Sequence, residues 1–393
     1  MWATIPSMRQ PTYPSFTLDE YRTRIDSLRR LMAARDMDAL VLHTPENICY
    51  VSGYQTPGYY WYMALIVPLE RDPVLIPPPH EESLVHAYSW VEDYRLFRDT
   101  TDWAAATRDT LASLGLTNAH IGLEHSSWFL TAKVARELEA IMRSATFSDG
   151  SGLVEEGRMV KSPAEIACIR RAAKAAEAGM SAGIEACRAG ATEAEVAVAA
   201  HRAQILAGSE YTGLPMFITS GERSLMVHAT WSDRRLRGGD VVFLEVPGSI
   251  NRYHAALSRC ACIGEPPDLL LRASEVNSDA LRQAKAAIRP GVPACDVFEA
   301  ARARIDGANI GYKQGRRVAY SLGIAFPPGW DEGHIISINV NETRPLRPGM
   351  VFHLITTMRL QAFGAIGCSD TVLATDAGCE TLTPNIGLTP HSR

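Results

Sequence analysis

The sequence lacks the long apolar segments and basic runs that mark membrane-spanning and nucleic-acid-binding proteins. No apolar stretch approaches the roughly 20 residues that a transmembrane helix needs, and the N-terminal segment MWATIPSMRQPTYPSF has no apolar core of a signal peptide. The formal net charge is −5, which disfavours nucleic acid as the main partner. We therefore expect a cytoplasmic protein that binds neither nucleic acid nor a membrane.

Paired cysteine motifs are also missing. The eight cysteines are scattered, with no CxxC pair and no zinc-ribbon spacing. This pattern is typical of reduced thiols in a cytoplasmic protein. Low-complexity segments and sequence repeats are absent too.

The chain is long enough for two domains, and its pattern changes near residue 155. Its 393 residues are 46% hydrophobic and 21% charged, as is ordinary for globular proteins. Thr17 and Glu20 predict a capping box before a helical stretch. Short apolar runs bounded by Pro or charge follow, namely MALIVPLE, DPVLIPPP and AHIGLEH. Residues 1–155 therefore predict an α/β domain.

Residues 156–393 separate helices from strands. Helix starts are predicted at Ser162 and Thr192, each followed three residues later by Glu, and further helices at about 274–288 and in CDVFEAARARIDGANI. Strands are predicted in MFITSGE, DVVFLEVPGSI, YHAALSRCACIG, GMVFHLITTMRL and SDTVLATDAG. Helices and antiparallel strands in separate runs indicate an α+β domain.

Five motifs occur in the order and spacing of a known superfamily. They are GRMVKSPAEIACIRRAAKAAEAGM, LRGGDVVFLEV, YHAALSR, LRPGMVFHL and SDTVLATDAGCETLT. The chain resembles the pita-bread fold of methionine aminopeptidase, Xaa-Pro peptidases and creatinase. The resemblance covers essentially the whole chain. It implies an N-terminal domain of the creatinase and prolidase kind, residues 1–155, followed along the chain by a pita-bread C-terminal domain, residues 156–393.

The resemblance also shows which metal ligands have been replaced. Peptidases of this fold hold two divalent metals with Asp, Asp, His, Glu and Glu. The five corresponding positions are Glu245, Ala256, Tyr320, Ile355 and Ser369. Hard divalent cations need several oxygen or imidazole donors, and Ala and Ile offer none. We therefore expect no metal, no other cofactor and no peptidase activity.

Two residues are the leading catalytic candidates. His228, in SGERSLMVHATW, stands where creatinase-like members carry an acid/base histidine. Glu245 lies within the apolar run VVFLEV, where an unpaired carboxylate is costly to bury. It should therefore have a cationic partner or a raised pKa. The alternatives are a structural histidine and a structural ion pair.

Two further histidines join them as catalytic candidates. By strand alternation, either Tyr253 or His254 faces the cavity, Tyr253 as a substrate-binding residue. His353 precedes Ile355 by two residues and so points to the same strand face. Each histidine could equally be a hydrogen-bonded core residue.

The segment AYSLGIAFPPGWDEGH supplies candidate substrate-binding residues. It replaces the ligand histidine by Tyr320 and adds Asp331, Glu332 and His334 on a Pro/Gly-rich loop. Loops on rigid scaffolds often carry site residues, although solvated charge is the alternative.

The aromatic segment GYYWYM, residues 58–63, suggests a homodimer. In creatinase-type dimers this segment closes the site of the neighbouring subunit. Tyr59 and Trp61 would then form an aromatic wall for a delocalised cation, whereas the alternative is core packing. A substrate carboxylate would need another partner, for which Arg223 and Arg359 are candidates.

An amidinium or guanidinium carbon is already cationic and depends less on metal activation than a peptide carbonyl does. It needs a carboxylate and an acid/base group, which Glu245 and His228 supply. Two metal-free branches of the fold suit such substrates, creatinase and ectoine hydrolase. The glutamates of the creatinase branch would stand at Ser258 and Ile355 and are missing.

We predict a metal-independent hydrolase of a C–N bond in a small cationic or zwitterionic cyclic amidine, of the ectoine-hydrolase type. The alternatives are a creatinase-like amidinohydrolase and a catalytically silent small-molecule-binding protein.

Overall fold

A computed structural model describes residues 9–98, 103–226, 228–310, 312–313, 315, 317–361 and 363–393. The chain divides into two compact units, residues 1–158 and 159–393. All eight cysteines are free thiols. Within the described ranges, no helix has both the length and the apolar character needed to cross a bilayer.

The N-terminal unit is built on a six-stranded mixed sheet with the order β4-β3-β2-β1-β5-β6. Its strands are β1 (Ala39–Leu42), β2 (Ala64–Pro68), β3 (Val74–Ile76), β4 (Asp93–Tyr94), β5 (His120–Leu123) and β6 (Thr146–Asp149). Its helices are α1 (Leu18–Ala33), α2 (Pro45–Ser52), α3 (Glu82–Tyr88), α4 (Trp103–Ser113) and α5 (Ala132–Ile141), and α6 (Leu153–Met159) ends it. β1 runs parallel to β5 and antiparallel to β2. This alternation of strands and helices is the predicted α/β architecture.

The C-terminal unit contains a ten-stranded sheet with the central order β12-β11-β13-β14-β9-β8-β7. Its strands are β7 (Phe217–Ser220), β8 (Val241–Ile250), β9 (Tyr253–Cys262), β10 (Tyr312–Lys313), β11 (Arg317–Ser321), β12 (Ser337–Asn339), β13 (Val351–Leu360), β14 (Gly364–Thr375), β15 (Gly378–Thr381) and β16 (His391–Ser392). Its helices are α7 (Pro163–Ala186), α8 (Glu193–Leu206), the short η1 (Gly221–Leu225), α9 (Asp268–Ala287) and α10 (Ala294–Ala308). Helices and antiparallel strands are segregated, as the α+β prediction required.

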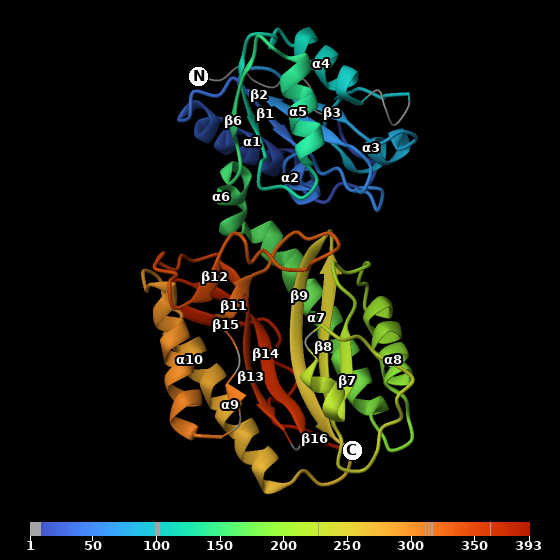
Figure 1. Ribbon diagram of the computed structural model, residues 1–393, viewed down its shortest axis with the longest axis vertical. Coiled ribbons are helices and arrows are strands. Elements are labelled where there is room, and N and C mark those ends of the chain that lie inside the picture. Colours follow the sequence, from blue (N-terminus) through green and yellow to red (C-terminus); the bar gives the residue numbers. More distant parts are fainter. Residues whose placement is uncertain are drawn as a thin grey trace. The chain divides into compact units, whose positions relative to one another are not determined.

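Two helix pairs, α7 with α8 and α9 with α10, cover the sheet of this unit (Figure 1). α7 packs on β8 and β9, and α9 packs on β13 and β14. Each pair encloses its own apolar cluster against the sheet. The predicted capping boxes at Ser162 and Thr192 are present, with both reciprocal hydrogen bonds. α9 begins at Asp268, six residues before the predicted start, because Pro267 directly precedes its first turn.

Candidate active site

The central sheet brings the five metal-ligand positions of the fold into two neighbouring rows. Glu245 is paired with Ser258, Ser258 with Ser369, and Ser369 with Ile355. Direct cross-strand partners point to the same face, so these side chains form one row. The next row contains the pair Tyr320–His353 and Thr371, whose hydroxyl hydrogen-bonds to the backbone of Ala256.

A cavity of about 260 Å³ opens along these rows. Glu245, Tyr320 and Ile355 line it, together with the predicted His228 and Asp331. Further walls come from three arginines and a group of apolar and hydroxyl side chains, among them Arg302, Arg317, Arg359, Phe217, Phe243, Trp330, Thr219 and Thr357. Its mixed lining is typical of a site for a small polar molecule.

Glu245 is the titrating carboxyl group of the cavity. Its side chain is 15% exposed, and its Oε1 lies 3.9 Å from His353 Nδ1. Burial raises the pKa of Glu245 to about 7, although the positive charge of Arg317 acts in the opposite direction. Of the two predicted alternatives, a cationic partner and a raised pKa, the raised pKa is present, and both protonation states are populated near neutral pH. A carboxyl group in that state can accept and return a proton.

A hydrogen-bonded chain links His353 to the cavity wall. His353 Nε2 lies 2.6 Å from Ser369 Oγ, which also accepts the Ser258 amide at 2.6 Å. At the other end of the ring, Nδ1 lies 2.7 Å from the hydroxyl of Tyr320. That hydroxyl also accepts the indole N–H of Trp330 at 2.9 Å. Burial lowers the pKa of His353 to about 3, so its imidazole is neutral.

The neutral imidazole carries one proton, and the serine decides on which nitrogen. If Nε2 held it, Ser369 would receive two N–H donors, and its own proton would have no acceptor among the described residues. An unsatisfied buried donor costs about 1–3 kcal/mol. With the proton on Nδ1, Ser369 donates to Nε2 of His353, and His353 donates to Tyr320. This arrangement satisfies Ser369 and both nitrogens of His353, and the hydroxyl proton of Tyr320, which lines the cavity, is left for a group in that space.

Tyr320 therefore acts as a neutral donor in this cavity. Burial and the neighbouring charge of Glu245 raise the pKa of Tyr320 well above its ordinary value, so the phenol keeps its proton. The predicted position of Tyr320 at the cavity wall agrees with the structure. Trp330 lies in the same loop segment, but its role could not be predicted, because nothing in the sequence pattern indicates which hydroxyl its indole meets.

His228 lies at the cavity wall on an exposed turn. Its backbone has φ 65°, and its ring centroid is 5.6 Å from that of Phe217. Phe217 is the cross-strand partner of Glu245, so the histidine and the carboxyl group face the same space. The imidazole of His228 is therefore both exposed to solvent and adjacent to the cavity.

The prediction that either Tyr253 or His254 faces the cavity is wrong. His254 is on the same strand face as Ala256 but lies beyond the cavity. It is fully buried, with Nε2 accepting the Gly213 amide and Nδ1 2.9 Å from the carbonyl of Arg252. The hydroxyl of Tyr253 donates to Glu165 at 2.7 Å in the interior. Both residues therefore have structural roles.

The loop residues Glu332 and His334 are also corrected. Glu332 forms a 2.8 Å ion pair with Lys161, and both side chains are 1% exposed. Its carboxylate also accepts the hydroxyl of Ser321. His334 is exposed and does not line the cavity. Of the charged residues predicted on this loop, Asp331 is the one at the cavity wall, because Glu332 turns inward to neutralise a buried lysine.

The aromatic segment of the N-terminal unit divides into exposed and packed members. Trp61 is 42% exposed and Tyr60 is 75% exposed. Tyr62 stacks on Trp103 at 4.7 Å, and the ring of Tyr59 meets Phe129 edge-on at 5.8 Å. Trp61 is therefore not a core residue of its own unit.

Arg317 lies at the cavity although nothing in the sequence pattern indicates it. Its guanidinium lies 4.5 Å from the centre of the Tyr320 ring. Simple alternation would put residues 317 and 320 on opposite faces of β11. The register of β11 shifts between Arg317 and Ala319, however, and this irregularity brings Arg317 over Tyr320.

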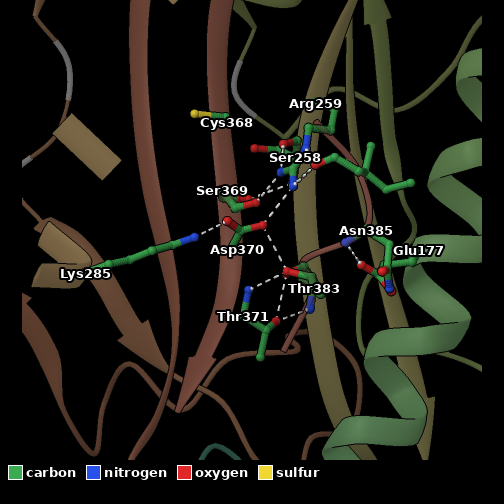
Figure 2. Close-up of polar contacts among 12 residues, drawn as sticks. Glu177, Ser258, Arg259, Lys285, Cys368, Ser369, Asp370, Thr371, Thr383 and Asn385 are labelled. Carbon is green, nitrogen blue, oxygen red and sulfur yellow. Dashed lines mark hydrogen bonds and ion pairs between the residues drawn. The ribbon is translucent and has the colours of Figure 1, made fainter. Parts of the chain in front are cut away.

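A buried ion network supports the strands behind the site. Figure 2 shows Asp370 between Lys285 and Arg259. Asp370 Oδ1 is 2.8 Å from Arg259 Nη2, and its Oδ2 is 2.5 Å from Lys285 Nζ. Thr383 donates to the same carboxylate. Because neighbours along a strand alternate faces, Asp370 points to α9 while Ser369 points to the site.

The side chains at the five ligand positions do not fit a two-metal centre. Ala256 and Ile355 carry no donor atom, and the oxygens of Ser369 and Tyr320 are engaged in the chain through His353. Glu245 is the one carboxylate of the set. Within the described part of the chain, no group of three or more His, Cys, Asp or Glu side chains could hold a metal ion.

Known proteins with this architecture span nearly the whole chain. An X-Pro aminopeptidase from Thermotoga maritima superposes with a TM-score of 0.82 at 21% identity, covering 94% of this chain and 99% of that one. A prolidase from Pyrococcus horikoshii gives a TM-score of 0.81 at 22% identity, covering 93% and 99%. Because both identities are low, these structures establish the fold alone and not the activity.

Sequence relatives and family models assign the chain to a family. Ectoine hydrolase of Halomonas elongata is 27% identical, covering 93% of this chain and 96% of its own. An uncharacterized hydrolase/peptidase of Sinorhizobium fredii is 30% identical, covering 94% and 96%. The model of the creatinase/prolidase N-terminal domain matches residues 24–160, and that of metallopeptidase family M24 matches residues 167–376. The chain therefore belongs to metallopeptidase family M24, with a creatinase/prolidase N-terminal domain and a pita-bread C-terminal domain.

Proposed function

We propose that this M24-family hydrolase cleaves a non-peptide C–N bond of a small amidine without a metal ion. The observation that carries the proposal is the composition of the five ligand positions, where Glu245 is the one remaining carboxylate. Ectoine hydrolase, among the relatives, provides the precedent for a cyclic amidine substrate. Ectoine is accordingly the first compound to test.

The cavity contains the groups that such a reaction needs. An amidine and one water molecule yield an amide and an amine. The carboxylate form of Glu245 holds the cationic N–C–N system and takes a proton from the attacking water. Tyr320 donates a hydrogen bond into the cavity, and His228 returns a proton to the departing nitrogen.

The same composition disfavours the creatinase-like alternative. That branch would need glutamates at Ser258 and Ile355, and the Oγ of Ser258 is buried without a hydrogen-bond partner. A catalytically silent binding protein is the remaining alternative. It predicts tight binding of a small molecule without turnover.

Purified protein should hydrolyse at least one member of a panel of cyclic amidines that includes ectoine. Since the site lacks metal donors, a chelator such as EDTA should leave the rate unchanged. Metal analysis should find well under one equivalent of Mn, Zn, Co or Fe per chain, whereas a genuine metal centre would contain roughly stoichiometric metal. Chelator-sensitive turnover with stoichiometric metal would contradict the proposal. Binding without turnover would favour the silent alternative.

We also propose that the protein is a homodimer in which the neighbour's aromatic segment completes the site. Trp61→Ala should raise KM roughly tenfold through loss of cation–π contact. It should hardly change the melting temperature, because Trp61 is 42% exposed. Trp128→Ala, which truncates an exposed tryptophan of the same unit outside the aromatic segment, is the matched control and should leave KM unchanged. A monomer in light scattering, or a Trp61→Ala variant that melts early with normal KM, would refute the dimer site.

A further inference from the structure

The charged residues of the cavity are unevenly supplied with partners. Arg302, Arg317 and Arg359 face two carboxyl groups, Glu245 and Asp331. Arg302 reaches Asp306 at 3.4 Å, and Arg317 reaches the hydroxyl of Ser337 at 3.4 Å. Among the described residues of the cavity wall, positively charged side chains thus outnumber carboxyl groups.

Arg359 is the arginine whose charge is least satisfied. Among the residues that the structure describes, no carboxylate pairs with it, and its Nε is buried without a hydrogen-bond partner. The residue is half-buried on β13 between Met358 and Leu360, which point to the core. A buried guanidinium atom without a partner is costly unless a ligand supplies an acceptor.

The other arginine that the sequence suggested for a carboxylate is already engaged. Arg223 Nε lies 3.1 Å from the fully buried carboxylate of Glu193, and its Nη2 donates to the carbonyl of Thr230. It also does not line the cavity. Arg359 is therefore the better candidate for binding an anion.

The strand register shows how far Arg359 lies from the carboxyl group. Ile355 occupies the row of Glu245, and Arg359 follows four residues later on the same face of β13. At about 3.3 Å per residue, this separation is roughly 13 Å of strand, which the long arginine side chain shortens. Phe243 and Thr357 line the cavity between the two charges.

We propose that Arg359 forms a carboxylate-binding subsite and that the natural substrate is a two-ended zwitterion. Its cationic amidine or guanidine group would lie at Glu245, an apolar spacer against Phe243 and Thr357, and its carboxylate at Arg359. This inference rests on the function proposed above and deepens it. It predicts a substrate with a longer spacer between its charges than a compact ring amino acid has. The planar guanidinium suits a carboxylate because it can donate two parallel hydrogen bonds.

Isothermal titration calorimetry with simple probes tests the subsite. The probes are guanidinoacetate and its longer homologues, each compared with an n-alkylguanidine of the same length that lacks the carboxylate. For the longer homologues, the carboxylate should lower Kd by roughly tenfold or more. Arg359→Gln should abolish this difference, Arg359→Lys should keep part of it, and Arg272→Gln on the exposed surface of α9 should keep all of it.

The outcomes separate the subsite from the proposed function. A carboxylate advantage that survives in a folded Arg359→Gln variant, or none in the wild type, overturns the subsite. Alkylguanidine binding that Glu245→Gln abolishes supports the amidine site independently of Arg359. Carboxylates that bind through Arg359 while no alkylguanidine or amidine binds would leave the subsite standing and refute the amidine proposal. Melting curves and the charge-retaining Arg359→Lys variant guard against misfolding.

Discussion

Glu245→Gln and His228→Ala should each lower kcat by at least about a hundredfold, the usual lower limit for loss of an acid/base group. The glutamine keeps the size of the side chain but can neither hold an amidinium by charge nor accept a proton. The alanine removes the group proposed to return a proton to the departing nitrogen. Steady-state kinetics with the substrate found in the amidine panel measures both effects.

Two observations decide whether these losses are specific. Glu275→Gln removes a carboxylate from the exposed surface of α9 and should retain full activity. Circular dichroism should show that all variants are folded. Near-wild-type kcat in either site variant would remove that residue from the mechanism.

Glu245→Gln should also change how stability depends on pH. The pKa of Glu245 is about 7 in the folded protein, above its ordinary value of 4.5. The folded state therefore holds a proton that the unfolded state has lost between these values, so wild-type stability falls as pH rises through this window. The glutamine has no such dependence. Relative to wild type, the variant should gain up to about 3 kcal/mol between about pH 5 and about pH 8. A constant difference across this range would show that the carboxyl group is not perturbed.

Asp370→Asn should destabilise the C-terminal unit by about 3–5 kcal/mol, the usual effect of removing one partner from a buried ion pair. The side chains of Arg259 and Asp370 are 1% and 2% exposed, so the arginine would lose its buried counter-charge. Differential scanning calorimetry should show the loss as an earlier transition. The network is on the opposite sheet face from the cavity, so substrate KM should change little at a temperature where the variant is folded.

Lys285→Gln is the matched control for this network. Its side chain is 19% exposed, and its removal leaves the ion pair of Asp370 and Arg259 intact. The loss should be clearly smaller, on the order of 1 kcal/mol. Equal losses in the two variants would mean that the ion pair of Asp370 and Arg259 is not the main source of the network's stabilising free energy.

Local sequence signals were sufficient for the framework of the protein. The capping boxes at Ser162 and Thr192 are present because each uses side chains only three residues apart. The alternation of β13 correctly placed His353 and Ile355 on one face, because a strand imposes a period of two. The motifs likewise identified the fold, since their order and spacing are properties of the chain itself.

The roles of the polar residues depended on partners that are distant in sequence. Glu332 was predicted at the site, but it neutralises Lys161, which lies 171 positions earlier. His254 is on the expected strand face yet beyond the end of the cavity, because the cavity is bounded by other segments. The proton of Tyr320 is directed by a chain through His353 and Ser369, on two other strands.

The sequence alone thus determined the elements and the fold, because these follow from short-range periodicity, capping and the spacing of the motifs. Only the tertiary structure decided which carboxyl group stays desolvated at the cavity, which histidine is locked in the sheet and which arginine remains without a partner. Burial, protonation and pairing are set by the sum of contacts from separate segments. A local pattern can name the candidates for a site such as that of Glu245 and Arg359, but the packing around them assigns the chemistry.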